Sequence, residues 1–302
     1  MSSIVKLKNL SIFYDNFRVL KNISFSLEEG TIGLLGPNGA GKTSLIKTLM
    51  GLHPSFTGEI EVLGLNVRKN PLKVRTKIGY VPEGEAYLNN VSSVQLVTFL
   101  GELAGIDNKT ALKRAHEVLE YVNLGEERYR KIEELSHGQQ SRVKLAQALI
   151  HDAKLLILDE PTDGMDPGKK QKFLDLIKRI QKETPMSILL ASHSLEDVET
   201  LCKKIILLNE GEVIGIKDIA DLSSAHKNIY VLHLTNNSEK FIELCKEEPI
   251  KVKEVYGSKI ILENIKETRN IFSLALNADC GISNFYPWIP SLESIFIEMI
   301  KY

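Results

Sequence analysis

Residues Gly36–Thr43 read GPNGAGKT, which fits the pattern G-x-x-x-x-G-K-[S/T] of a phosphate-binding loop, also called Walker A. The flanking residues supply the structural context that this loop needs. Thr31–Leu35 (TIGLL) is a short apolar run that favours a buried strand. Ser44–Met50 (SLIKTLM) has the apolar spacing of a helix, and Gly51 follows it as a C-terminal cap. The sequence therefore predicts a strand, a phosphate-binding turn and a helix at this point.

The glycines of this loop are expected to let the backbone approach a phosphate. Gly36, Gly39 and Gly41 lack a Cβ, so the chain can curl with positive φ and turn its amides inward. The helix that starts near Lys42 adds the positive end of its dipole. We expect Lys42 to reach the β- and γ-phosphates of a nucleotide and the Thr43 hydroxyl to ligate Mg²⁺. The remaining expected members of this nucleotide site are Pro37, Asn38, Ala40 and Ser44.

A second apolar run ends in two carboxylates. Residues Lys154–Pro161 read KLLILDEP, and Leu155–Leu158 has the unbroken apolar character of a central parallel strand buried on both faces. Asp159 and Glu160 follow at the carboxyl end of this strand, where α/β sheets bind their ligands. We expect Asp159 to hold Mg²⁺ and Glu160 to accept a proton from the attacking water. The other interpretation is that the two acids begin a solvated loop.

Composition limits the class of protein. The chain has 302 residues, of which 43% are hydrophobic and 25% charged, as in a soluble protein of one large or two medium domains. A formal net charge of −1 gives no reason to expect a nucleic-acid partner. No apolar stretch reaches the roughly 18 residues of a membrane span, and the first residues lack the apolar core of a secretion signal. The three separated cysteines favour reduced thiols, so we expect a cytoplasmic protein.

The most diagnostic string is LSHGQ at Leu135–Gln139, which precedes a helical run and then KLLILDEP. This arrangement resembles the ATP-binding cassette ATPases of the ABC transporter superfamily, whose signature is usually LSGGQ. The resemblance implies an α/β P-loop NTPase fold, a mixed sheet with a helical subdomain, and ATP and Mg²⁺ as cofactors. It also implies two cassettes packed head to tail, in which the signature of one chain caps the γ-phosphate of ATP held by the other. The signature residues acting in this way are Ser136, His137, Gly138 and Gln139.

Three further positions match the family. Tyr14 stands where the family has an aromatic side chain that stacks on adenine, although it could instead be a strand tyrosine that packs on the sheet. Asp166 ends the string DGMD, which resembles the loop that crosses the dimer interface. His193, in LLASHS, resembles the switch histidine and is expected to act in catalysis with Glu160. Independently of the resemblance, Ser194 and Asp197 have the spacing of a capping box for the next helix.

Glu83 departs from the usual family pattern. It ends the string IGYVPE, where the family usually has a glutamine whose loop joins Mg²⁺ to the membrane subunit. The glutamate resembles a subgroup of export ATPases. We expect Glu83 to join Thr43 and Asp159 around Mg²⁺, and to raise the pKa of a neighbouring carboxylate by like-charge repulsion.

The chain is expected to contain two domains. Residues 1–216 form the ABC ATPase domain, with its helical subdomain at about 84–147, and residues 217–227 form a linker. Residues 228–302 alternate as βαββαβ, the split βαβ or ferredoxin-like pattern, and end in an amphipathic helix at Leu292–Ile300. This second domain resembles the C-terminal extension of export-type cassettes. We expect an α+β accessory or regulatory module there, with a purely structural cap as the alternative.

The predicted function is that of an ATP-binding and ATP-hydrolysing subunit of an ABC transporter. ATP-dependent pairing with a second copy or a paralogue would drive export through a separate integral membrane permease, with this chain peripheral on the inner face of the cell membrane. The alternatives are an importer ATPase, a soluble ATP-driven clamp acting on the ribosome or DNA, and a nucleotide-binding regulator without turnover.

Overall fold

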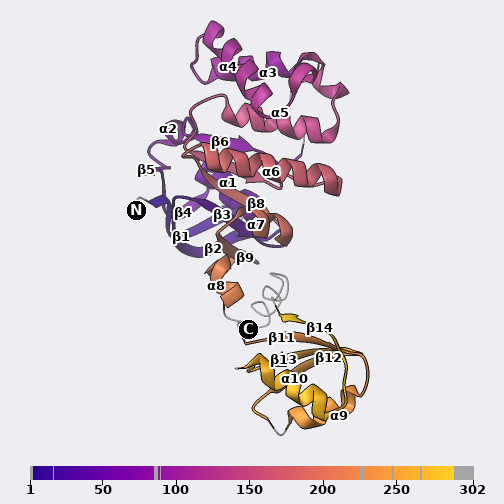
Figure 1. Ribbon diagram of the computed structural model, residues 1–302. Coiled ribbons are helices and arrows are strands. Elements are labelled where there is room, and N and C mark those ends of the chain that lie inside the picture. The colour runs from indigo at the N-terminus through magenta and orange to yellow at the C-terminus, as the bar shows by residue number, and fades with distance from the viewer. Residues whose placement is uncertain are drawn as a thin grey trace. The chain divides into compact units, whose positions relative to one another are not determined.

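The computed structural model describes residues 3–15, 17–84, 88, 90–224, 228–246, 248–265 and 267–288. The chain divides into two compact units, of which the first ends at Asp218 and the second begins at Ile219 (Figure 1). The segment expected as a linker, residues 217–227, contains the end of strand β10 and helix α8 (Ile219–Ser224). The predicted terminal helix at Leu292–Ile300 lies outside the described residues.

The first unit contains an antiparallel sheet of four strands in the order β2-β1-β4-β5. Strand β1 (Ser3–Tyr14) pairs antiparallel with β2 (Phe17–Glu28). Strand β4 (Phe56–Val62) pairs with the other edge of β1, and β5 is the short segment Leu65–Asn66. Buried apolar side chains on one face of these strands, such as Leu10 on β1, contribute to the main hydrophobic core.

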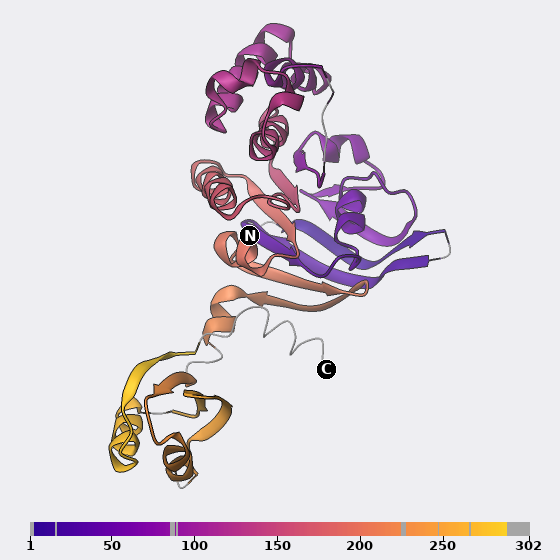
Figure 2. The ribbon, with the colours of Figure 1, turned by 90° about the vertical axis from the view of Figure 1, so that its right-hand side faces the viewer.

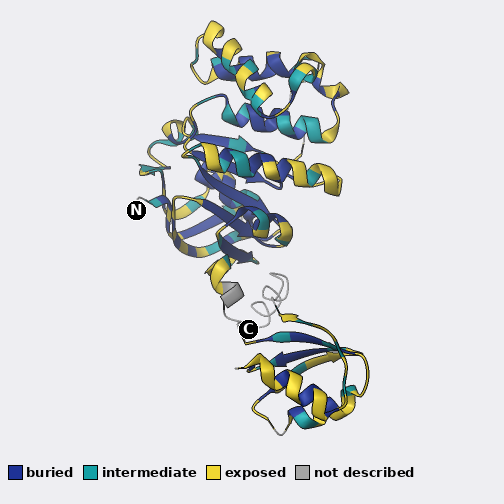
Figure 3. Cartoon of the chain, viewed as in Figure 1, coloured by how far each residue is buried: buried dark blue, intermediate teal, exposed yellow. Residues whose placement is uncertain are grey.

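The second sheet of this unit has six strands in the order β10-β9-β3-β8-β7-β6. The strands from β9 to β6 run parallel, and β10 pairs antiparallel with β9. Every residue of β3, β7 and β8 is buried, as Figure 3 shows by their colour, and this explains their unbroken apolar runs. The bounds of the strands are β3 Thr31–Leu35, β6 Ile78–Val81, β7 Leu155–Asp159, β8 Ser187–Ser192, β9 Lys204–Asn209 and β10 Glu212–Asp218.

Helices surround this sheet and also form a separate group. Figures 1 and 2 show α3, α4 and α5 gathered at one end of the first unit, which agrees with the predicted helical insertion. A capping box at Ser92 and Gln95 starts α3, since the Ser92 amide donates to Gln95 Oε1 at 2.8 Å. The bounds of the helices are α1 Lys42–Leu49, α2 Pro71–Arg75, α3 Ser93–Leu103, α4 Asn108–Tyr121, α5 His137–Leu149, α6 Pro167–Glu183 and α7 Leu195–Leu201, with short 3₁₀ turns at Gly125–Tyr129 and Ile132–Glu134.

The predicted capping box at the start of α7 is wrong. Ser194 occupies the N-cap position, but its side chain accepts no hydrogen bond from the first turn of the helix. The Asp197 carboxylate is fully buried, accepts a hydrogen bond from the Thr162 hydroxyl and forms an ion pair of 2.6 Å with Lys170 Nζ. A buried carboxylate gains more from an ammonium group and a hydroxyl than from capping, so Asp197 turns away from the helix end.

After α8, the second unit has the element order β11-α9-β12-β13-α10-β14, and these four strands form an antiparallel sheet in the order β12-β13-β11-β14. Its own core includes Leu232, Phe241, Ile260 and Ile271, so each helix packs apolar side chains against the sheet. The bounds of these elements are β11 Tyr230–Leu234, α9 Ser238–Cys245, β12 Lys251–Tyr256, β13 Lys259–Glu263, α10 Thr268–Asn277 and β14 Ile282–Pro287.

Within the described residues of both units, no helix has the length and apolarity that crossing a membrane requires.

Candidate functional site

The phosphate-binding loop lies between the end of β3 and the start of α1, as the sequence predicts. Gly39 and Gly41 have φ values of 82° and 104°, a region that residues with a Cβ rarely adopt. At position 36 the need for glycine does not come from the predicted positive φ. A Cβ at this position would lie 2.2 Å from the Leu208 carbonyl oxygen, so only glycine lets β3 and β9 approach here.

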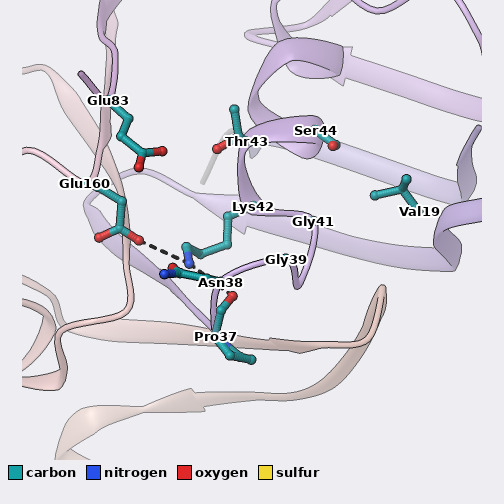
Figure 4. A pocket seen from close by; sticks show the side chains of 10 residues that line it. All are labelled: Val19, Pro37, Asn38, Gly39, Gly41, Lys42, Thr43, Ser44, Glu83 and Glu160. Atoms are coloured by element: carbon teal, nitrogen blue, oxygen red, sulfur yellow. Dashed lines mark hydrogen bonds and ion pairs between the residues drawn. The ribbon is translucent and has the colours of Figure 1, made fainter. Parts of the chain in front are cut away.

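The loop borders a cavity of about 390 Å³ (Figure 4). The sequence predicted all but one of its lining residues, and the exception is Val19 on β2, which looks like any apolar strand residue. Four residues predicted to bind the nucleotide, Tyr14, Gly36, Ala40 and Asp159, are not part of the described lining, and neither is the predicted catalytic residue His193. The cavity is lined by Val19, Pro37, Asn38, Gly39, Gly41, Lys42, Thr43, Ser44, Glu83 and Glu160.

Among the described residues that line this cavity, Lys42 alone holds an ammonium group. Its side chain is 6% exposed, and Nζ donates to the carbonyl oxygens of Gly36 at 2.7 Å and Pro37 at 3.3 Å. It also forms an ion pair of 3.1 Å with Glu160 Oε1, drawn in Figure 4. A buried cation among loop carbonyls can exchange these partners for phosphate oxygens that enter the cavity.

Glu160 joins Lys42 to His193. Its backbone has a φ of 45°, an uncommon value for a residue with a side chain and one that active sites often contain. Oε1 faces Lys42, while Oε2 accepts a hydrogen bond from the His193 amide at 3.2 Å and lies 2.9 Å from His193 Nδ1. The two predicted catalytic residues are therefore in direct contact. The His193 side chain is 48% exposed, so solvent reaches this pair from the histidine side.

Asp159 ends β7 and has no exposed surface. Its Oδ2 accepts hydrogen bonds from the Thr43 hydroxyl at 3.0 Å and from the Tyr80 hydroxyl at 3.4 Å. Its Oδ1 is buried and has no hydrogen-bond partner among the described residues. Burial is the main cause that raises the pKa of Asp159, and the nearby charges of Glu83 and Glu160 raise it further.

These groups fit a divalent cation. A buried carboxylate oxygen without a partner, next to a hydroxyl and a second carboxylate at Glu83, forms the hard oxygen donor set that Mg²⁺ prefers. A cation there would also offset the repulsion that raises the pKa of Asp159. The predicted metal ligands Thr43, Glu83 and Asp159 are therefore chemically suited to that role.

Tyr14 lies at the end of β1, and its side chain is partly exposed at 43%. Its ring meets the His53 ring edge-on, with 4.4 Å between the centroids. A partly exposed aromatic ring can stack on a nucleobase. Stacking of Tyr14 on adenine stays a prediction.

The signature forms a second cavity, of about 260 Å³, which shares no described lining residue with the first. Ser136 is the N-cap of α5, and its hydroxyl donates to Gln139 Oε1 at 3.1 Å. Ser136 and His137 are exposed, and Asp166 is exposed in an ion pair of 2.7 Å with Lys169. The signature cavity is lined by Asn123, Ser136, Gly138, Gln139, Arg142, Met165, Lys169, Lys172 and Phe173.

Sequence reasoning missed several residues that support the site. Tyr80 stands in the quoted string IGYVPE, but nothing local indicates that its hydroxyl reaches Asp159. Thr162 and Lys170 hold Asp197 in place from positions far along the chain. Lys144 was also missed, although the sequence gave one signal for it: this lysine lies on the apolar side of the helical run after the signature. The structure shows that its side chain is buried.

Comparison with known proteins supplies the family. Residues 20–163 match the family model described as ABC transporter. Over 233 residues the chain is 39% identical to the linearmycin resistance ATP-binding protein LnrL of Bacillus subtilis, covering 77% of this chain and 75% of LnrL. It is 28% identical to the bacitracin transport ATP-binding protein BcrA of Bacillus licheniformis, covering 99% of this chain and 98% of BcrA.

A manganese transport protein is also similar. The chain is 37% identical to the manganese transport system ATP-binding protein MntB of Halalkalibacterium halodurans, covering 74% of this chain and 89% of MntB. Relatives with different substances in their names are thus similar to this chain, which confirms the predicted family but not a cargo.

A solved structure places the fold in the same family. The dimeric post-hydrolysis state of the ATP-binding cassette MJ0796, bound to ADP and Pi, aligns with a TM-score of 0.65 and 25% identity. The alignment covers 71% of this chain and 98% of MJ0796. With the predicted α/β P-loop fold confirmed and the phosphate loop, acidic strand end and signature in place, this chain belongs to the ABC transporter family of ATP-binding proteins and is an ATPase.

Proposed function

We propose that this chain is the ATP-hydrolysing subunit of an exporter and works as a head-to-tail pair. The observation that carries this proposal is the separation of the two cavities within one chain. The exposed signature hydroxyl and the helix N-terminus behind it can bind a phosphate, and their cavity shares no described lining residue with that of the chain's own loop. A second copy or a paralogue, turned by a two-fold axis, would bring each signature to the other's nucleotide.

ATP would lie along the glycine loop, with adenine against Tyr14 and the phosphates at Lys42. When Lys42 turns to the phosphates, Glu160 loses its ion pair and can accept a proton from a water molecule that attacks the γ-phosphate. His193 contacts Glu160 and would orient that water. Mg²⁺ held by Thr43, Asp159 and Glu83 would neutralise charge on the β- and γ-phosphates.

The pairing of two such chains would drive a separate integral membrane permease from the cytoplasmic face. Export is favoured by Glu83 in place of glutamine and by the similarity to a resistance protein and a bacitracin transport protein. The second unit, which the match to BcrA spans almost completely, would serve as an accessory or regulatory module of this assembly. The family match supports a transporter over a clamp on the ribosome or DNA, and no nucleic-acid partner is expected.

The experiment compares the wild type with Glu160→Gln, in which the base is lost but the shape is kept. We expect Glu160→Gln to bind ATP, to accumulate as a dimer in light scattering with Mg²⁺ and ATP, and to hydrolyse ATP at least about 10²-fold more slowly. Glu212→Gln, a surface acid on β10 paired with Lys21, is the matched control and should behave as the wild type. Unchanged turnover in Glu160→Gln would remove Glu160 as the base. A monomer at saturating ATP would contradict the paired site.

A further inference from the structure

A buried lysine holds the loop that carries Glu83. Lys144 lies in the middle of α5 and is 6% exposed. Its Nζ donates hydrogen bonds to the carbonyl oxygens of Pro82 at 3.3 Å and Gly84 at 2.8 Å. These two carbonyls belong to the residues on either side of Glu83, so one ammonium group spans the peptide segment from which the Glu83 side chain projects.

The position of the ammonium group is itself fixed. Helix α5 packs closely on β6, because a Cβ at Gly79 would lie 2.2 Å from the Ala148 carbonyl oxygen. Glu83 follows β6 by two residues, so both the start of the loop and the lysine that holds it are anchored to the same helix–strand contact. Moving an ammonium group out of such a buried position without new acceptors is costly, so the loop and the helix are expected to move together.

The side chain of Glu83 points into the nucleotide cavity. Figure 4 shows its carboxylate directed toward Thr43, and its charge contributes to the raised pKa of Asp159. A carboxylate on an irregular segment needs a support to keep this direction against the repulsion of Asp159 and Glu160. The hydrogen bonds from Lys144 act on the backbone on both sides of that carboxylate.

We propose that Lys144 is a positioning residue for Glu83, which holds the Glu83 carboxylate at the cation site of the nucleotide cavity. This inference rests on the proposed function in one respect, the role of Glu83 toward Mg²⁺. It adds a structural consequence: the helix that begins with the signature also supports the metal side of its own chain's nucleotide site.

The test measures binding rather than turnover, in full-length chains that also carry Glu160→Gln. Calorimetry gives the affinity for ATP with Mg²⁺ and with EDTA, and the ratio of the two is the gain due to the metal. We expect Lys144→Met to lower this gain by about 3- to 10-fold and to leave binding in EDTA unchanged. Lys144→Arg should restore most of the gain. Ser141→Ala removes another buried polar group of the same helix, whose hydroxyl donates to the His137 carbonyl of the helix backbone, and should change nothing.

A double-mutant cycle with Glu83→Ala separates positioning from general destabilisation. If Lys144 acts through Glu83, Lys144→Met has no further effect on the metal-dependent gain once Glu83 is alanine. Two results would overturn this inference but not the role of Glu83. In one, the reductions of the metal-dependent gain from Lys144→Met and Glu83→Ala multiply in the double variant. In the other, Lys144→Met keeps a normal metal-dependent gain while Glu83→Ala has a reduced one. A normal gain in Glu83→Ala would overturn it together with the proposed role of Glu83. If Lys144→Met does not fold, Lys144→Gln carries the same test, because its shorter amide cannot reach both carbonyls.

Discussion

At the scale of single residues, Asp159 carries a charge that the folded chain accommodates poorly without a cation. Burial raises its pKa above the ordinary 3.8, so the folded state binds a proton more tightly than the unfolded state. The free energy of unfolding therefore falls as the pH rises from about that value through the folded pKa. The same carboxylate that would bind Mg²⁺ costs stability when the metal and nucleotide are absent.

We expect Asp159→Asn to be more stable than the wild type at pH 7 in EDTA, because the amide removes this buried charge. Each kcal/mol gained would raise the melting temperature by about 2–4 °C. The difference should shrink as the pH falls and vanish below about 3.8, where both the folded and the unfolded wild type are protonated at this residue. Urea unfolding at several pH values measures this. Asp152→Asn is the control: its exposed carboxylate has a pKa lowered by Arg114, so its small effect should have the opposite sign. A variant less stable than the wild type at pH 7 would contradict the account.

The sequence could predict the site residues whose role depends on their immediate neighbours in the chain. The phosphate loop, the two acids and the signature are short strings whose chemistry needs those residue types at that spacing. Gly36 was predicted for the wrong reason, because the Leu208 carbonyl that excludes a Cβ comes from a distant strand. Tyr80 and Lys144 were missed for a similar reason, because tertiary packing sets their partners. Only the place of Lys144 in an apolar helical run gave a local signal, and that signal does not name its partners.

At the scale of elements, α6 and α7 are joined by a buried ion pair. Asp197 on α7 is fully buried between Lys170 on α6 and Thr162, which lies 35 positions earlier in the chain. The spacing of Ser194 and Asp197 alone suggested a capping box. A sequence pattern indicates only partners that are close in the chain, whereas the stronger partners of Asp197 are distant in the sequence. The helices and strands themselves were predictable from apolar periodicity, as for α6 with its stripe of Phe173, Leu174 and Ile177.

We expect Lys170→Met to destabilise the first unit by about 3–5 kcal/mol, the typical cost of leaving a buried charge without its partner. Lys170→Arg keeps the charge and should lose far less. Lys182→Met changes an exposed lysine on the last turn of the same helix and serves as the control, with an effect within about 0.5 kcal/mol. Chemical unfolding followed by circular dichroism measures all three. A Lys170→Met variant as stable as the Lys182→Met control would show that the ion pair contributes nothing.

At the scale of the whole molecule, the chain contains two units with separate hydrophobic cores. The main core of the first unit uses residues from Ile4 to Leu208, and the core of the second uses residues from Leu232 to Ala278. The sequence predicts a domain end at residue 216, whereas β10 continues to Asp218. Periodicity could not place this boundary, because the last strand residues are exposed and polar.

A chain that ends at Asp218 is expected to fold by itself and to bind ATP as the full chain does, because the phosphate loop, both acids and the signature lie in the first unit. Circular dichroism melting and calorimetry with ATP measure this. The comparison chain ends at Leu201, lacks β9 and β10, and should not fold, since β9 pairs with β3 beneath the phosphate loop. Loss of ATP binding in the chain ending at Asp218 would mean that the second unit completes the nucleotide site.

The central claim is that the glycine loop of one chain meets the signature of another across ATP. The most direct measurement is disulfide-length cross-linking between a Glu160→Gln chain that carries Asn38→Cys and a Glu160→Gln chain that carries Ser136→Cys, both positions being exposed in the single chain. The account predicts a covalent dimer that forms from the mixture only with Mg²⁺ and ATP, and from neither chain alone. Saturating ATP without cross-linking in the mixture, or a cross-link formed within one chain that carries both cysteines, would contradict it.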